Sequence, residues 1–135
     1  MIQGIKNKLG NLVATEIQTT KELIQVQPHQ GMFNYRCHEN SIEFARINPD
    51  HKVVETIYID SAGLPILHYV NQAPDGTYLD TTLGYKAEFY EYYFLRVIHP
   101  NDYKAMGWLF DNTVDYWSNK YLKWWHKLLG ISRLV

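Results

Sequence analysis

Three side chains in this sequence have the chemistry of a thiol nucleophile with its base. Cys37 is the only cysteine and stands where a loop gives way to a helical pattern, while His68 and Asp80 lie in successive strand-like runs. A thiolate is the reactive form of cysteine, and a helix start or a nearby protonated histidine lowers the thiol pKa from about 8.5. A carboxylate that accepts one ring N–H fixes the histidine tautomer and stabilises imidazolium. These types, in this order, predict a nucleophile, a base and an orienting group.

The turn between the two strand-like runs decides whether His68 and Asp80 can meet. A three-residue loop over 74–76, with its glycine in the left-handed conformation, places Val70 opposite Asp80. His68 and Asp80 then lie diagonally on one face, within hydrogen-bonding reach. A two-residue Asp-Gly loop would shift the register by one and turn Asp80 away. We predict the three-residue loop because a proline precedes Asp-Gly.

The elements that must position these residues follow from hydrophobic patterns. Small and apolar residues recur every three or four positions from Cys37 to Ile47, which predicts a helix that Pro49 stops. Runs rich in β-branched or aromatic residues predict strands over 21–26, 53–59, 66–72, 77–83 and 87–98, and helical spacing returns over 103–111 and 114–129. We expect residues 1–20 to form a short helix or a loosely attached arm. The pattern predicts an α+β fold, with the cysteine-bearing helix packed on an antiparallel sheet and helices at the C-terminal end.

Composition limits the class of protein. The chain of 135 residues is 46% hydrophobic and 20% charged, which is typical of one folded domain over 1–135. A formal net charge of −1 argues against nucleic acid as a partner. No apolar run approaches the roughly 20 residues of a membrane span, and the first residues have no signal-peptide pattern. With a single cysteine, these features lead us to expect a soluble cytoplasmic protein.

Residues 30–84 resemble the transglutaminase-like branch of the papain-like cysteine hydrolase superfamily. The similarity rests on Arg-Cys-His-Glu-Asn-Ser at 36–41, on a strand histidine, and on Asp-Gly-Thr-Tyr-Leu-Asp-Thr-Thr at 75–82. Small phage and bacterial members carry a comparable Lys/Arg-Cys-x-x-Asn-Ala/Ser motif. This chain departs from the pattern at Thr81, where the family favours proline, and at Val70, where an aromatic residue is frequent.

The resemblance implies roles for individual residues. Cys37 would be the nucleophile, His68 the base and Asp80 the orienting group. The oxyanion donors would be the Cys37 backbone N–H and a side chain just upstream, with Gln30 and Asn34 as candidates. Asn34 is also a candidate helix N-cap, and the motif marks Asn40 as a supporting residue.

The function that the resemblance implies is acyl transfer from a protein or peptide amide through a thioester. A peptidase, an amidase, a deamidase and a transamidase share this first step, and none requires a cofactor. A phage-encoded member would act in the host cytoplasm.

Other interpretations of the same residues stay open. A lone cysteine is often a small buried hydrophobe, and Asn71 could orient His68 in place of Asp80, although the preferred register puts it on the other face. His38 invites a metal site, but the histidines show no ligand spacing and we expect no metal. A thiol redox sensor lacks a second cysteine. The main alternative is a non-catalytic binding or structural protein on the same fold, with a partner surface on the Trp-rich C-terminal helix.

Overall fold

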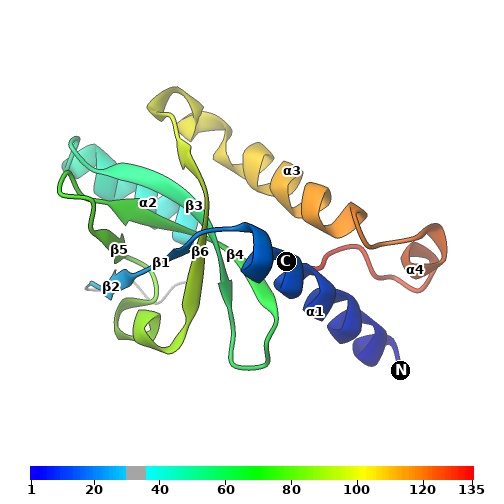
Figure 1. The fold of residues 1–135 in the computed structure, drawn as a ribbon. Coiled ribbons are helices and arrows are strands. Elements are labelled where there is room, and N and C mark those ends of the chain that lie inside the picture. Colours follow the sequence, from blue (N-terminus) through cyan, green and yellow to red (C-terminus); the bar gives the residue numbers. More distant parts are fainter. Residues whose placement is uncertain (30–35) are drawn as a thin grey trace.

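The computed structural model describes residues 1–29 and 36–135 (Figure 1). The first half of the chain contains α1 (Ile2–Thr20), β1 (Leu23–Ile24), β2 (Val26–Pro28), α2 (Cys37–Ile47), β3 (Lys52–Ile59) and β4 (Pro65–Gln72). The second half contains β5 (Tyr78–Asp80), the 3-10 helix η1 (Gly84–Phe89), β6 (Glu91–Ile98), the 3-10 helix η2 (Pro100–Ala105), α3 (Met106–Asn119) and α4 (Trp124–Leu128). The fold is α+β, as the patterns predict.

The sheet is mixed, which corrects the expectation of an antiparallel sheet. Its six strands run in the order β1-β6-β3-β4-β5-β2, and β2 pairs with β5 in parallel while the other pairs are antiparallel. Only Gln25 separates β1 from β2, so one extended segment pairs with both edges and the sheet curls round to meet it. With β1 and β2 counted as one segment, the ring has an odd number of members. Alternating directions cannot close an odd ring, so one pair must be parallel.

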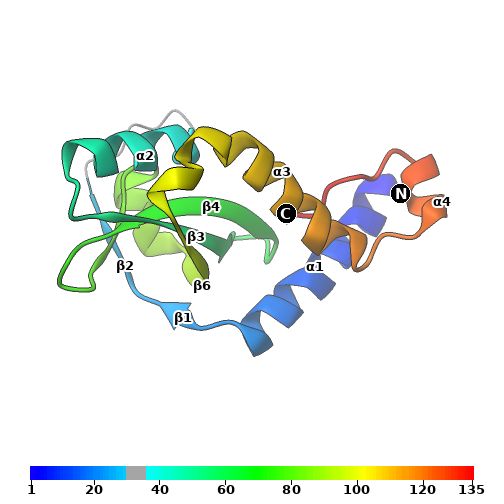
Figure 2. The same ribbon diagram turned by 90° about the horizontal axis from the view of Figure 1, so that it is seen from above.

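The curled sheet has an outer face covered by helices and an inner face closed on itself. Figure 2 shows α2 and α3 over the same side of the sheet. The outer face packs on α1 and on the C-terminal helices through Leu9, Val13, Ile17, Ile57, Leu67, Tyr93, Val114 and Trp117. The inner face holds Ile24, Val26, Val54, Val70, Ala87 and Tyr92. Because side chains alternate along a strand, Leu67 and Tyr69 point outward, while His68 points inward.

Several segments differ from the expectations, and one of them is β5, which ends at Asp80 where the pattern predicts a strand to residue 83. Residues 1–20 form a 19-residue helix with Val13 and Ile17 fully buried, rather than a short or loosely attached one. The aromatic strand begins at Glu91, because residues 84–89 form η1. The two helices predicted over 103–111 and 114–129 are not separated near residue 112. Instead α3 continues to Asn119, and the chain turns before α4.

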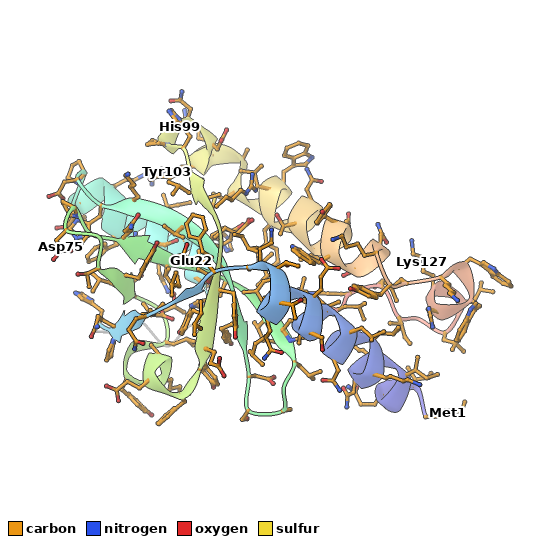
Figure 3. All side chains as sticks on the ribbon, viewed as in Figure 1. Met1, Glu22, Asp75, His99, Tyr103 and Lys127 are labelled. Atoms are coloured by element: carbon orange, nitrogen blue, oxygen red, sulfur yellow. The ribbon has the colours of Figure 1, made fainter. Side chains whose placement is uncertain are left out.

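Two features that carry the candidate site are those predicted, the cysteine-bearing helix and the register of the hairpin. Helix α2 spans Cys37–Ile47, as expected from the pattern and Pro49. In the hairpin, Asn71 pairs with Leu79, which is the register of the three-residue loop. Ala73 N–H donates to Thr77 O at 2.8 Å and Gly76 has φ 91°, the left-handed conformation that glycine favours. Asp75 lies at the tip of this turn (Figure 3).

Candidate active site

Cys37 is the first residue of α2, and its side chain is buried. Arg36 occupies the N-cap position, and the first helical hydrogen bond runs from Asn40 N–H to Arg36 O at 2.9 Å. The N–H groups of Cys37, His38 and Glu39 therefore point out of the helix end. A helix start carries partial positive charge, which favours a thiolate over a thiol.

Two asparagines fix α2 against the hairpin. The fully buried Asn71 donates from Nδ2 to Ser41 O at 2.9 Å, one turn after Cys37. Asn40 donates from Nδ2 to Thr82 Oγ1 at 2.9 Å, just after Asp80. Asn71 thus binds the cysteine-bearing helix and is not the group that orients His68.

His68 and Asp80 form the contact that the hairpin register predicts. Their atoms Nε2 and Oδ2 lie 2.9 Å apart, and both side chains are buried. The other carboxylate oxygen, Oδ1, accepts from Thr82 N–H at 2.9 Å and from Leu83 N–H at 2.8 Å. Tyr92 donates its hydroxyl to Oδ2 at 2.5 Å. With four donors arranged around it, the carboxylate is held ionised and in one orientation.

The thiol reaches His68 because the hairpin ladder stops early. Cys37 belongs to the cluster on the outer face, whereas the His68 side chain points inward. The paired register of β4 and β5 ends at Asn71 and Leu79, and continuing it would direct Tyr69 N–H towards Thr81. In its place, the Tyr69 backbone N–H forms a hydrogen bond with the Cys37 thiol. The thiol thus lies at an open edge of β4, where it also meets the imidazole of His68.

The contacts make this a thiolate and imidazolium pair near neutral pH. Burial raises the pKa of Cys37, but hydrogen bonds from His38 and His68 outweigh burial and lower it to about 6. Burial lowers the pKa of His68, but Asp80 and Cys37 outweigh burial and raise it to about 10. Burial also opposes ionisation of Asp80, but hydrogen bonds from His68 and Tyr92 hold the pKa of that carboxyl below its usual range. Because Asp80 takes Nε2 of His68, the ring's Nδ1 remains for the thiol.

His38 is a second histidine on the thiol, and the sequence analysis missed this role. Neighbouring helical residues diverge by about a quarter-turn, yet the half-buried His38 side chain forms a hydrogen bond with Cys37. The thiol raises the pKa of His38. Its place directly after the cysteine, at a helix end where the chain is least constrained, is the signal that could have indicated this contact.

A cavity of about 290 Å³ opens beside the thiol. It is lined by Cys37, His38, Tyr58, Ile66, Leu67, His68, Thr82, Leu83, Phe110 and Arg133. Phe110 comes from α3 and Arg133 from the segment after α4, so the C-terminal part of the chain completes a site whose chemistry lies in residues 37–80. The sequence analysis did not select Phe110 or Arg133.

Two predicted site residues, Gln30 and Asn34, lie outside the described residues. Asn40, the third supporting residue, is described and holds Thr82 rather than facing the thiol. Within residues 1–29 and 36–135, no group of three or more His, Cys, Asp or Glu side chains is arranged to hold a metal ion. Over the same residues, none of the helices is long and apolar enough to cross a membrane.

Comparisons with protein-family models, with curated proteins and with solved structures found no match. The candidate site therefore rests on its own geometry.

Proposed function

We propose that this chain is a thiol hydrolase or acyltransferase with a papain-like, transglutaminase-like core, which acts on amide or ester carbonyls. One observation carries the proposal. The His68 ring contacts the Asp80 carboxylate through Nε2 at 2.9 Å, and the same side chain forms a hydrogen bond with the thiol of Cys37. A buried imidazole between a carboxylate and a thiol is the arrangement that makes and keeps a thiolate.

The first step of the proposed reaction needs no further group. The Cys37 thiolate attacks the carbonyl carbon, and the carbonyl π electrons move to oxygen to form a tetrahedral oxyanion. The oxyanion collapses to a thioester as the bond to the leaving amine or alcohol breaks, and imidazolium His68 gives that group its proton. Water or an amine then attacks the thioester with neutral His68 as base, which releases the acyl product and restores the thiolate and imidazolium pair.

The start of α2 supplies charge stabilisation for the oxyanion. The Cys37 backbone N–H belongs to the unpaired first turn of the helix, so it is available to donate to the oxyanion. Removal of one oxyanion donor from a serine protease costs roughly 10²–10³ in rate, which gives the order of magnitude of such a contribution. Asp80 keeps its charge and position through four donors, so His68 is oriented without a mobile partner.

The pH dependence of Cys37 alkylation by iodoacetamide tests the proposal. The chain has no other thiol, so each modification reports on this site. We expect the wild-type rate to rise with an inflection at about pH 6. In His68→Gln and in Asp80→Asn, the inflection should move towards the unperturbed value of about 8.5. An inflection near 8.5 in the wild type would overturn the proposal.

A matched control separates coupling from general loss of structure. His126 is buried, as His68 is, but it lies in α4, where its Nδ1 accepts from Lys123 N–H at 2.9 Å. His126→Gln should leave the Cys37 inflection near pH 6. Turnover of a 4-nitrophenyl ester, with loss of turnover in Cys37→Ser, then distinguishes a reactive thiol from a catalytic one.

A non-catalytic binding protein on the same fold is the second candidate function. It is favoured by the burial of Cys37, which is 7% exposed, and by large exposed apolar side chains on the C-terminal helices. Trp108 is 67%, Trp124 75% and Leu128 77% exposed. Figure 3 places Lys127, on α4, at the opposite end of the molecule from Asp75. If the chain is such a binding protein, we expect no ester turnover. We also expect that Trp124→Ser, but not Cys37→Ser, changes its association as measured by sedimentation or affinity.

A further inference from the structure

The cavity beside Cys37 is basic. Its described lining includes the side chains of His38, His68 and Arg133, and none of the described lining residues is Asp or Glu. The carboxylate of Asp80 lies behind His68 and is fully buried. The His68 imidazolium balances the Cys37 thiolate, so Arg133 leaves the lining with a net positive charge, which attracts anions and raises their local concentration.

Arg133 is positioned to meet a ligand in this cavity. Its Nε donates to Val135 O at 2.5 Å, and its guanidinium carbon lies 5.2 Å from the centre of the Phe110 ring. These two contacts restrain the exposed side chain, and the hydrogen bond to Val135 does not use its two terminal nitrogens. Within residues 1–29 and 36–135, none of the ion pairs involves Arg133. A restrained guanidinium that pairs with no Asp or Glu side chain among the described residues is suited to a bidentate carboxylate.

Phe110 also connects Arg133 to the reacting groups. The ring of Phe110 lies 6.3 Å from the His38 ring, and His38 contacts the Cys37 thiol. One aromatic side chain of α3 is thus shared between the arginine and the histidine next to the nucleophile. A substrate held by Arg133 would lie across Phe110, with its carbonyl towards Cys37.

We propose that Arg133 is a specificity-determining residue that binds a carboxylate of the acyl substrate. This proposal deepens the proposed function and rests on it, since the substrate is the one that Cys37 would attack. The carboxylate has two possible sources, an Asp or Glu side chain beside the scissile carbonyl or the free C-terminus of a short peptide. Among the described residues, the groups that contribute most to the pKa shifts of Cys37 and His68 do not include Arg133, so the role we assign to it is recognition.

The test compares two alkylating reagents that differ in one charge. Iodoacetate carries a carboxylate and iodoacetamide is its neutral counterpart, and both modify the single thiol. The iodoacetate to iodoacetamide rate ratio reports on cationic groups near Cys37. Arg133→Gln should lower this ratio about threefold or more relative to the wild type, while Arg133→Lys should lower it less. Added salt should reduce the wild-type ratio towards that of Arg133→Gln.

The matched control is Arg46→Gln, which removes one positive charge from the exposed side of α2. Arg46 pairs with Glu43 at 3.8 Å and does not line this cavity. Its ratio should equal the wild-type ratio. A ratio in Arg133→Gln equal to that of Arg46→Gln would overturn the carboxylate proposal.

Peptide protection distinguishes the two sources. One peptide carries a glutamate and an amidated end, the second a glutamine and a free C-terminal carboxylate, and the third a glutamine and an amidated end. If the first peptide protects Cys37 from iodoacetamide better than the third does, the carboxylate comes from a side chain. If the second peptide protects it better than the third does, the carboxylate is the free C-terminus. Equal protection by all three would overturn the proposal. The proposed function fails separately, through an unshifted iodoacetamide inflection that does not depend on Arg133.

Discussion

Tyr92 donates its hydroxyl to Asp80 Oδ2 at 2.5 Å, the same oxygen that faces the imidazole of the candidate site. This bond sets how much negative charge Asp80 presents to His68. Burial and the Asp80 carboxylate both raise the pKa of Tyr92, so it stays a hydrogen-bond donor. The phenol therefore belongs to the support of the candidate site, although it lies on β6, outside the segment that the sequence analysis assigned to it.

Tyr92→Phe should weaken both the fold and the anchoring of Asp80. A buried hydrogen bond to a charged group contributes about 1.5–3 kcal/mol, so we expect a loss of that order in the free energy of unfolding by urea. The carboxylate would also present its charge with one donor fewer, and the alkylation inflection of Cys37 should shift. Tyr90→Phe is the control, because the Tyr90 ring packs on Tyr58 at 4.7 Å in the same aromatic cluster. Equal stability of the two variants would contradict the assigned role of Tyr92.

Removal of the second histidine should change the thiol without unfolding the chain. The hydrogen bond from His38 is the largest of the contributions that lower the pKa of Cys37. In His38→Gln, we expect the alkylation inflection to rise above 6 while the urea midpoint changes little, because His38 is only half-buried. His51→Gln, which removes an imidazole that packs on Phe44 at 5.1 Å and is not among the main contributors to the pKa shift of Cys37, should leave the inflection in place. An unchanged inflection in His38→Gln would leave His68 as the sole partner of the thiol.

The coupled pair predicts how stability depends on pH. The pKa of Cys37 is lowered to about 6 in the folded chain. The stability that ionisation of Cys37 contributes to the folded state is therefore complete above the unfolded pKa of about 8.5 and is lost as pH falls through 6. The pKa of His68 is raised to about 10, so its contribution is complete below about 6.5 and is lost as pH rises through 10. Between pH of about 6.5 and 8.5 the two changes oppose each other, and this pair should give a level free energy of unfolding.

Cys37→Ser tests that cancellation. Without the thiolate, only the His68 contribution changes, and the free energy of unfolding should fall by on the order of 1 kcal/mol per pH unit relative to the wild type. This fall runs from pH of about 6.5 up to a His68 pKa that Asp80 still raises and Cys37 no longer does. Urea titrations at three pH values between 6.5 and 8.5 measure the difference, in which the other titrating groups cancel. Parallel curves for the two proteins would show that thiol and imidazole are not coupled.

Asn71→Ala should damage the fold rather than the coupling. Asn71 is fully buried, donates to Ser41 O at 2.9 Å and accepts from Thr81 Oγ1 at 3.2 Å. Its removal leaves buried polar groups unpaired, at a cost of roughly 2 kcal/mol in urea unfolding. The dependence of the alkylation inflection on His68 should persist in the Asn71→Ala background. Loss of that dependence would favour Asn71, and not Asp80, as the group that orients the imidazole.

The sequence by itself determined the local parts of this site. The helix from Cys37 to Ile47 follows from hydrophobic spacing and from Pro49, which disfavours a helical residue before it. The hairpin register follows from the turn at 74–76, because its glycine takes a left-handed φ of 91° and two strands joined by a tight turn have few alternative pairings. The diagonal contact between His68 and Asp80 is a consequence of that register. These features depend on residues close together in the chain.

Only the tertiary structure decided what meets the thiol. Cys37 lies on the outer face and the His68 side chain points inward, and they meet because β5 leaves the ladder with β4 after Leu79. No local pattern encodes where a strand pair ends or that β1 and β2 close the two edges of one sheet. The extent of α1 burial and the arrival of Arg133 beside Cys37 likewise depend on how distant helices pack. Hydrophobic periodicity and turn chemistry depend on residues that are close together in the chain. A cavity is formed by segments that are far apart in the chain, and no sequence pattern indicates which of them will meet.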